Sequence, residues 1–298
     1  MLDAWQVITL AVSSIFIIAL WVSSTYGRHA AVVMLALSAI TLGCVWIAYE
    51  VAPVEAWRRD NLLVGLVIFA IPAAVGGLLA LVRARRRGCR LDRQFVVYLA
   101  LLWVTPALLL YVSQRRPWDG ELSNLMWWAG TTISIYVLVP VAYARWAGQS
   151  VRGYGLSVAF VRREGILIAL IAPVALALAW FVSADARFQE VYPFYDGDGA
   201  GLLAFELAYG ASFIALEFFF RGFLVFAGQP VLGVYAIPVM AMSYCLLHLG
   251  KPLPETVASL VGGLILGYLA LRLRSILAGV VAHLTMAWGM DAAVLTRS

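Results

Sequence analysis

Four ionisable residues in the last third of the chain have types and positions that fit acid–base chemistry: Glu217, Arg221, His248 and His283. Each lies in or at the end of an apolar run long enough to cross a bilayer. A charged group at membrane depth is costly and by default marks a functional site with a partner. One carboxylate and two imidazoles can activate water, because the carboxylate takes a proton, one imidazole moves protons and the other stabilises an oxyanion.

Each of these residues also has a purely structural interpretation. Glu217 and Arg221 are four residues apart, so they share a helix face and can neutralise each other as an ion pair that locks a helix bundle. His248 precedes a glycine- and proline-rich stretch at 250–255 that ends its helix, where a histidine can serve as a cap. His283 alone can be a hydrogen bond between helices. The combination of the four residues favours the catalytic interpretation.

A metal site is an alternative use of the same residues, since two histidines and one glutamate are a known zinc ligand set. We nevertheless predict no cofactor and no metal. The three cysteines, Cys44, Cys89 and Cys245, have no spacing typical of metal thiolates or disulfides. Glu206 lies about three turns before Glu217 on nearly the same face, as a second pairing partner, a pathway residue or an interfacial carboxylate.

The composition indicates the solvent in which these residues work. Of the 298 residues, 63% are hydrophobic and only 12% charged, and the mean hydropathy is +0.91. Soluble domains have about 25% charged residues, so a lipid bilayer must cover most of this surface. We predict an all-α, polytopic bundle of about 8–10 spanning helices. The ten candidate spans are 4–26, 30–52, 61–82, 94–113, 124–144, 165–183, 201–226, 232–249, 256–273 and 275–296.

The net charge of +5 does not indicate a nucleic-acid partner. The positive charge lies in short arginine-rich loops between apolar runs, which is typical of topology determinants in membrane proteins. We therefore expect a multi-pass protein whose partners are the lipid bilayer and a membrane-associated substrate.

Three motifs resemble those of the CPBP family, the CAAX-prenyl-protease and bacteriocin-processing intramembrane endopeptidases, also called the Abi family. The stretch Leu-Glu-Phe-Phe-Phe-Arg-Gly-Phe-Leu at 216–224 resembles the first motif, Glu-Glu, three residues, then Arg. Tyr244 and His248 fit the second, an aromatic residue, three residues, then His. His283 begins the third, and the order and the gaps of about 30 and 35 residues also fit.

The resemblance implies an intramembrane glutamic endopeptidase that cleaves a membrane-associated protein or peptide. Glu217, or a water positioned by it, is expected to act with His248, while His283 stabilises the oxyanion and Arg221 orients Glu217. The peptidase core is expected at 165–298, after an N-terminal accessory transmembrane region at 1–160. Because members of this family commonly occur in bacteria, the resemblance also implies location in the cell membrane, the inner membrane of a bacterium.

This chain departs from the family pattern in two of the three motifs. Leu216 stands where the first glutamate, usually the water-activating base, is expected, so this is a lone-glutamate variant. Adjacent helical positions differ by about 100°, and Glu217 therefore needs a rotated or distorted helix to take over. Ala287 replaces the asparagine of the third motif, with Asp291 one turn further on.

Two other functions stay open. A non-proteolytic CPBP-fold scaffold or immunity protein keeps the fold without the first glutamate. A proton-coupled transporter would use Glu206, Glu217 and the histidines as a relay, but the sequence has no internal symmetry of the kind transporters show.

Helix lengths predict a break in the core. Counted at about 1.5 Å per residue, His248 lies about 25 Å into its segment, much deeper than Glu217 or His283. The three residues reach one depth only if the eighth helix effectively begins near Pro238 or if residues 218–230 fold back.

Overall fold

The fold is entirely helical across the residues that the computed structural model describes, 4–51, 62–88, 90–157 and 161–297. Nine segments among them are long and apolar enough to cross a membrane, which confirms the predicted polytopic bundle. The seventh and eighth predicted spans fall within one apolar segment, Gly199–Leu247. The chain is therefore a multi-pass membrane protein.

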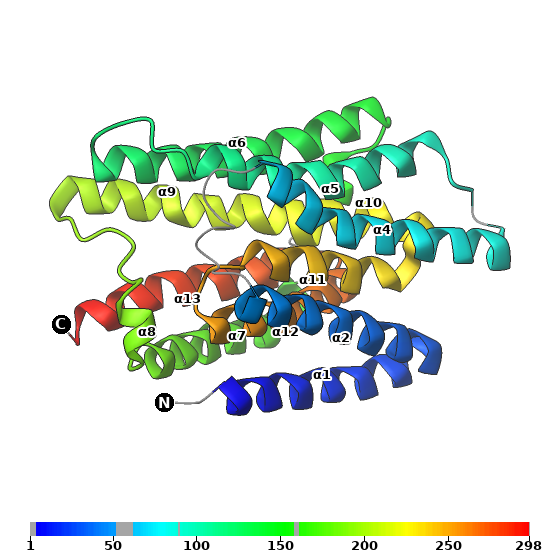
Figure 1. Ribbon diagram of the computed structural model, residues 1–298, viewed down its shortest axis with the longest axis horizontal. Coiled ribbons are helices and arrows are strands. Elements are labelled where there is room, and N and C mark those ends of the chain that lie inside the picture. Colours follow the sequence, from blue (N-terminus) through cyan, green and yellow to red (C-terminus); the bar gives the residue numbers. More distant parts are fainter. Residues whose placement is uncertain (1–3, 52–61, 89, 158–160, 298) are drawn as a thin grey trace. The chain divides into compact units, whose positions relative to one another are not determined.

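The helices form two compact units, and the first combines the described residues up to Tyr111 with Phe223–Leu271. Its helices are α1 (Ala4–Tyr26), α2 (Arg28–Val51), α4 (Leu62–Arg87), α5 (Arg93–Ser113), α10 (Val225–Leu232), α11 (Ala236–Leu247) and α12 (Leu253–Leu273), some of which end just beyond these limits (Figure 1). α11 packs against α2, α4 and α10. N-terminal helices therefore contact the helix that leads to His248.

A single residue joins α1 to α2 as a helical hairpin. Gly27 has φ +91°, a conformation that residues with a side chain rarely adopt, and it lets the chain reverse at once. The outer face of α1 is apolar, since Trp5 and Ile17 are 70% and 68% exposed. Such a face is stable against lipid and not against water.

The predicted break lies between α10 and α11. Gly233 has φ +61° and begins a 3₁₀ turn, η3 (Gly233–Tyr235), after which α11 starts at Ala236. α11 thus begins two residues before Pro238, which agrees with the first of the two alternatives that the helix lengths allowed. Arg83 stabilises the end of α10, because its Nε donates to the carbonyl of Val231 at 2.7 Å.

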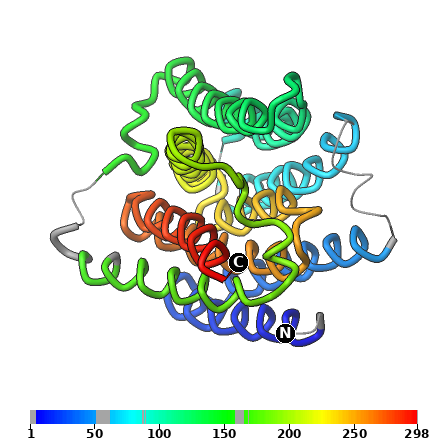
Figure 2. The backbone as a smooth tube through the Cα atoms, turned by 90° about the vertical axis from the view of Figure 1, so that its left-hand side faces the viewer, coloured from blue at the N-terminus to red at the C-terminus, as the bar shows by residue number. Residues whose placement is uncertain are grey.

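The second unit combines Val112–Gly222 with the described residues from Arg272 onwards. Its elements are α6 (Glu121–Trp146), the short 3₁₀ turn η1 (Val151–Gly153), α7 (Val161–Val182), α8 (Ala186–Gln189), α9 (Gly199–Glu217), most of the π-helix η2 (Phe218–Leu224), and α13 (Leu277–Leu295). α13 packs against α7 and α9, and α6 packs against α9 (Figure 2). α9 therefore has a neighbour on two sides.

Small residues permit this close packing. A Cβ at Gly210 of α9 would come within 2.6 Å of the Trp288 ring on α13. A Cβ at Gly289 of α13 would come within 3.0 Å of Leu176 on α7. Glycines at such positions let helices in a membrane approach one another closely.

Candidate active site

The first motif lies where α9 changes into a π-helix. α9 ends at Glu217, and Phe218–Leu224 form the π-helix η2. A π-helical turn contains an extra residue, changes the helical register after it and occurs often at functional sites. The helix therefore departs from α-helical geometry directly after the lone glutamate, and the change of register affects the residues that follow, including Arg221.

Aromatic packing holds the π-helix in place. Phe219 stacks on Tyr136 of α6 with ring centroids 4.5 Å apart, and Phe220 meets the same ring edge-on at 5.5 Å. On another side, a Cβ at Gly222 would come within 2.7 Å of the Tyr154 carbonyl oxygen. Large rings and a glycine at these positions fix the irregular segment that carries Arg221.

Glu217 and Arg221 form the ion pair that their spacing predicts. Arg221 Nη1 lies 3.0 Å from Glu217 Oε1, and both side chains are 0% exposed. A buried ion pair gains little over apolar packing, but removing one partner is strongly destabilising because the other charge stays buried. The pair therefore has a large structural role, whatever else it does.

His283 of α13 completes this cluster in the second unit. Its Nδ1 lies 2.7 Å from Glu217 Oε1 and 3.2 Å from the carbonyl oxygen of Gly279. Both partners can only accept hydrogen bonds, so Nδ1 carries a proton and, in the neutral ring, Nε2 holds the lone pair. Phe213 stacks on the imidazole at 5.5 Å, which fixes the plane of the ring.

Gly279 is a site residue that the sequence interpretation missed. A Cβ at this position would collide with the Glu217 carboxylate, so only glycine lets the carboxylate approach α13. Its backbone carbonyl also accepts from His283. One signal was available in the sequence, since Gly279 precedes His283 by four residues and therefore lies on the same helix face.

The two residues noted at the third motif, Ala287 and Asp291, lie away from Glu217. Ala287 packs in an aromatic cluster with Phe205 and Tyr209. Asp291 is buried and faces Glu206, the carboxylate that sequence reasoning placed near the Glu217 face. Eleven helical residues separate Glu206 from Glu217, which is about 16 Å along α9. The two acidic residues therefore make a separate pair.

His248 belongs to the first unit, in the turn between α11 and α12. Its Nδ1 lies 2.9 Å from the carbonyl oxygen of Tyr244, and the Tyr244 ring meets the imidazole edge-on at 4.6 Å. The carbonyl can only accept, so Nδ1 again carries the proton. The second motif thus works locally, with the tyrosine four residues earlier orienting the histidine.

The structure thus brings Glu217, Arg221 and His283 into one cluster and places His248 in the other unit. In the described part of the chain no group of three or more His, Cys, Asp or Glu side chains is arranged to hold a metal ion. The donor set of the cluster also fits zinc poorly, because the His283 nitrogen that faces Glu217 carries a proton and Arg221 adds positive charge.

The sequence was compared with protein families, with curated proteins and with solved structures. Residues 198–289 match the family model described as type II CAAX prenyl endopeptidase Rce1-like, a segment that contains Glu217, Arg221, His248 and His283. The curated proteins and the solved structures gave no match. Residues 198–289 of this membrane protein are thus similar to type II CAAX prenyl endopeptidases, which confirms the CPBP resemblance of the three motifs.

Proposed function

We propose that this protein is an intramembrane endopeptidase that hydrolyses a peptide bond in a membrane-associated protein or peptide. One observation carries the proposal: the Glu217 carboxylate, buried at membrane depth, lies 2.7 Å from His283 Nδ1. The same residues lie inside the segment that matches the endopeptidase family model. A buried carboxylate that orients a histidine is a recurrent way to prepare a base in hydrolases.

The geometry supports a different division of roles from the one the motifs suggest. Glu217 is 0% exposed and bound by Arg221, whereas the His283 side chain is 16% exposed. We therefore assign the proton transfer from water to His283 Nε2, with Glu217 as the group that holds the ring and balances its charge. In the motif-based roles, Glu217 took the proton and His283 stabilised the oxyanion.

His248 is assigned the second proton transfer. Its Nδ1 proton is held by the Tyr244 carbonyl, so the protonated ring can give its Nε2 proton to the leaving amine. The proton that His283 takes from water is then released to solvent, and solvent reprotonates His248. Arg221 keeps Glu217 charge-balanced and holds it in place. The substrate bond would be cleaved by water alone, without a cofactor or metal.

A scaffold or immunity protein without proteolytic activity is the second candidate, and one observation favours it. Glu217 and Arg221 have no exposed side-chain surface, as expected of an ion pair with a structural role. The two candidates differ in what the partly exposed His283 side chain does. A scaffold has no use for it, whereas the peptidase needs it for every turnover.

The test uses the full-length protein in lipid nanodiscs. The probes are a fluorescence-quenched transmembrane peptide and a quenched peptide that ends in a prenylated Cys-aliphatic-aliphatic-X sequence. We expect the wild type to cleave one of them, and His283→Gln and His248→Gln to lower kcat by at least about 100-fold, the usual contribution of a general acid or base. Glu206→Gln on α9 is the matched control and should cleave like the wild type.

Folding is monitored in parallel, because Glu217→Gln leaves Arg221 buried without a counter-charge. Glu217→Gln/Arg221→Met removes both charges and should restore the yield of folded protein while staying inactive. Cleavage by His283→Gln at the wild-type rate would refute the assigned mechanism. Loss of activity with a chelator, restored by zinc, would favour a metal enzyme instead.

A further inference from the structure

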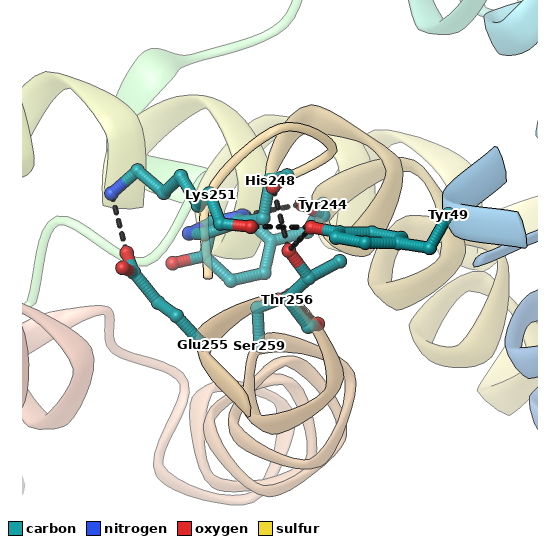
Figure 3. Close-up of polar contacts among 7 residues, drawn as sticks. All are labelled: Tyr49, Tyr244, His248, Lys251, Glu255, Thr256 and Ser259. Atoms are coloured by element: carbon teal, nitrogen blue, oxygen red, sulfur yellow. Dashed lines mark hydrogen bonds and ion pairs between the residues drawn. The ribbon is translucent and has the colours of Figure 1, made fainter. Parts of the chain in front are cut away.

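The turn that carries His248 is held from outside by an N-terminal helix. After α11 the chain turns at Gly250, which has φ +87°, and it enters α12 at Leu253. Backbone groups in such a turn cannot all be paired within a helix and need other partners. Figure 3 shows the Tyr49 side chain of α2 with its hydroxyl between the Lys251 carbonyl and the Thr256 hydroxyl.

Three short contacts connect Tyr49 to the backbone of His248. The Tyr49 hydroxyl lies 2.5 Å from the carbonyl oxygen of Lys251 and 2.8 Å from Thr256 Oγ1. Thr256 Oγ1 lies 2.7 Å from the carbonyl oxygen of His248. Thr256 is fully buried, so these bonds form away from solvent and gain strength from the low dielectric.

A count of protons shows how the contacts depend on one another. The carbonyl of Lys251 can only accept, so the single hydroxyl proton of Tyr49 points to it. The single proton of Thr256 then goes either to the His248 carbonyl or to the Tyr49 oxygen. With the Thr256 proton on the His248 carbonyl, the Tyr49 hydroxyl fixes the second half of the turn through Lys251, and Thr256 fixes the first half. The Lys251 N–H, which donates to the His248 carbonyl, connects the two halves.

The position of this turn sets the position of the imidazole. His248 Nδ1 donates to Tyr244 within the same helix end, so the ring follows the backbone of the last helical turn. The His248 carbonyl accepts from the Lys251 backbone N–H at 3.1 Å as well as from Thr256. A shift of about 1 Å in a group that moves protons can lower a rate strongly.

We infer that Tyr49 is a positioning residue that fixes the turn of His248 for catalysis. The inference rests on the proposed peptidase function and gives the N-terminal region, through α2, a part in it. It assigns Tyr49 no contact with substrate: the tyrosine acts through Lys251, Thr256 and the backbone of His248.

Tyr49→Phe in the full-length protein tests the inference with two measurements. The first is hydrogen exchange, by mass spectrometry in nanodiscs, of peptides that cover residues 248–256. We expect about three- to tenfold faster exchange there, as the loss of one net hydrogen bond predicts. The second is cleavage of whichever probe the wild type cleaves, where kcat should fall about three- to tenfold with KM unchanged within about twofold.

Matched variants separate positioning from general stability. Tyr26→Phe removes a hydroxyl from α1 in the same unit and should change neither measurement. Thr256→Val should reproduce the effect of Tyr49→Phe, whereas Thr256→Ser keeps the hydroxyl and should keep wild-type kcat. The double variant Tyr49→Phe/Thr256→Val should lose less than the product of the two single losses, because both substitutions break one connected set of bonds.

The two measurements give distinguishable outcomes. Faster exchange together with lower kcat in Tyr49→Phe, and wild-type behaviour in Tyr26→Phe, supports the inference. Unchanged exchange, or faster exchange with wild-type kcat, overturns it. If the wild type cleaves neither probe, the proposed peptidase function fails, and the exchange measurement alone decides whether Tyr49 fixes the turn.

Discussion

Different kinds of interaction hold the two histidines of this protein in place, although both histidines are in the same tautomeric form. His283 Nδ1 lies 2.7 Å from a buried carboxylate, which in turn pairs with a buried guanidinium. His248 donates its Nδ1 proton to a backbone carbonyl in a turn held by neutral hydroxyl groups. Full charges in the bilayer thus position one histidine, and backbone geometry positions the other.

Each site also contains an ion pair between residues four apart, and the two pairs differ in burial. Glu217 and Arg221 are 0% exposed, whereas the side chains of Lys251 and Glu255 are 23% and 18% exposed. A buried charge whose partner is removed cannot reach water, while a partly exposed charge can. The first pair is therefore a requirement of the fold, and the second contributes to one turn.

The largest difference should appear when one partner of each pair is removed. Arg221→Met leaves the Glu217 carboxylate buried without a counter-charge and should lower the free energy of unfolding by about 3–5 kcal/mol. Lys251→Met should lower it by less than about 1 kcal/mol. Denaturant unfolding of both variants in mixed micelles measures the two changes. Equal losses would contradict the proposed difference between the sites.

A smaller effect is expected from adding one methyl group next to Glu217. Gly279→Ala places a Cβ against the Glu217 carboxylate, so we expect a loss of about 1–3 kcal/mol together with reduced cleavage. The matched control is Gly262→Ala in α12, where a Cβ meets no atom within 4 Å. That control should be neutral or stabilising by up to about 1 kcal/mol, since alanine favours a helix over glycine. Thermal unfolding in nanodiscs and the cleavage assay compare the two variants.

The sequence predicts the features that arise within one helix, but not the contacts between helices far apart in the chain. The Glu217–Arg221 pair follows from the four-residue spacing alone, and the need for a distorted helix follows from Leu216 and the 100° step between neighbours. Similarly, the break before α11 follows from helix length. Contacts between elements far apart in the sequence do not follow, because no local pattern records them: the approach of Gly279 to Glu217 and the bonds of Tyr49 to the His248 turn both depend on tertiary packing.

The smallest expected effect is that of salt on the unfolding free energy that each ion pair contributes. Lys251 is the only lysine among the 21 basic residues, and its Nζ lies 2.5 Å from Glu255 Oε1 at a partly exposed position. At about 1 M salt the screening length falls to about 3 Å, so the contribution of this pair should shrink towards zero. The difference in unfolding free energy between Lys251→Met and the wild type, a fraction of a kcal/mol at low salt, should then vanish. The difference for Arg221→Met should persist, because ions do not enter the buried cluster; a parallel decline of both differences would show that salt reaches the Glu217 site.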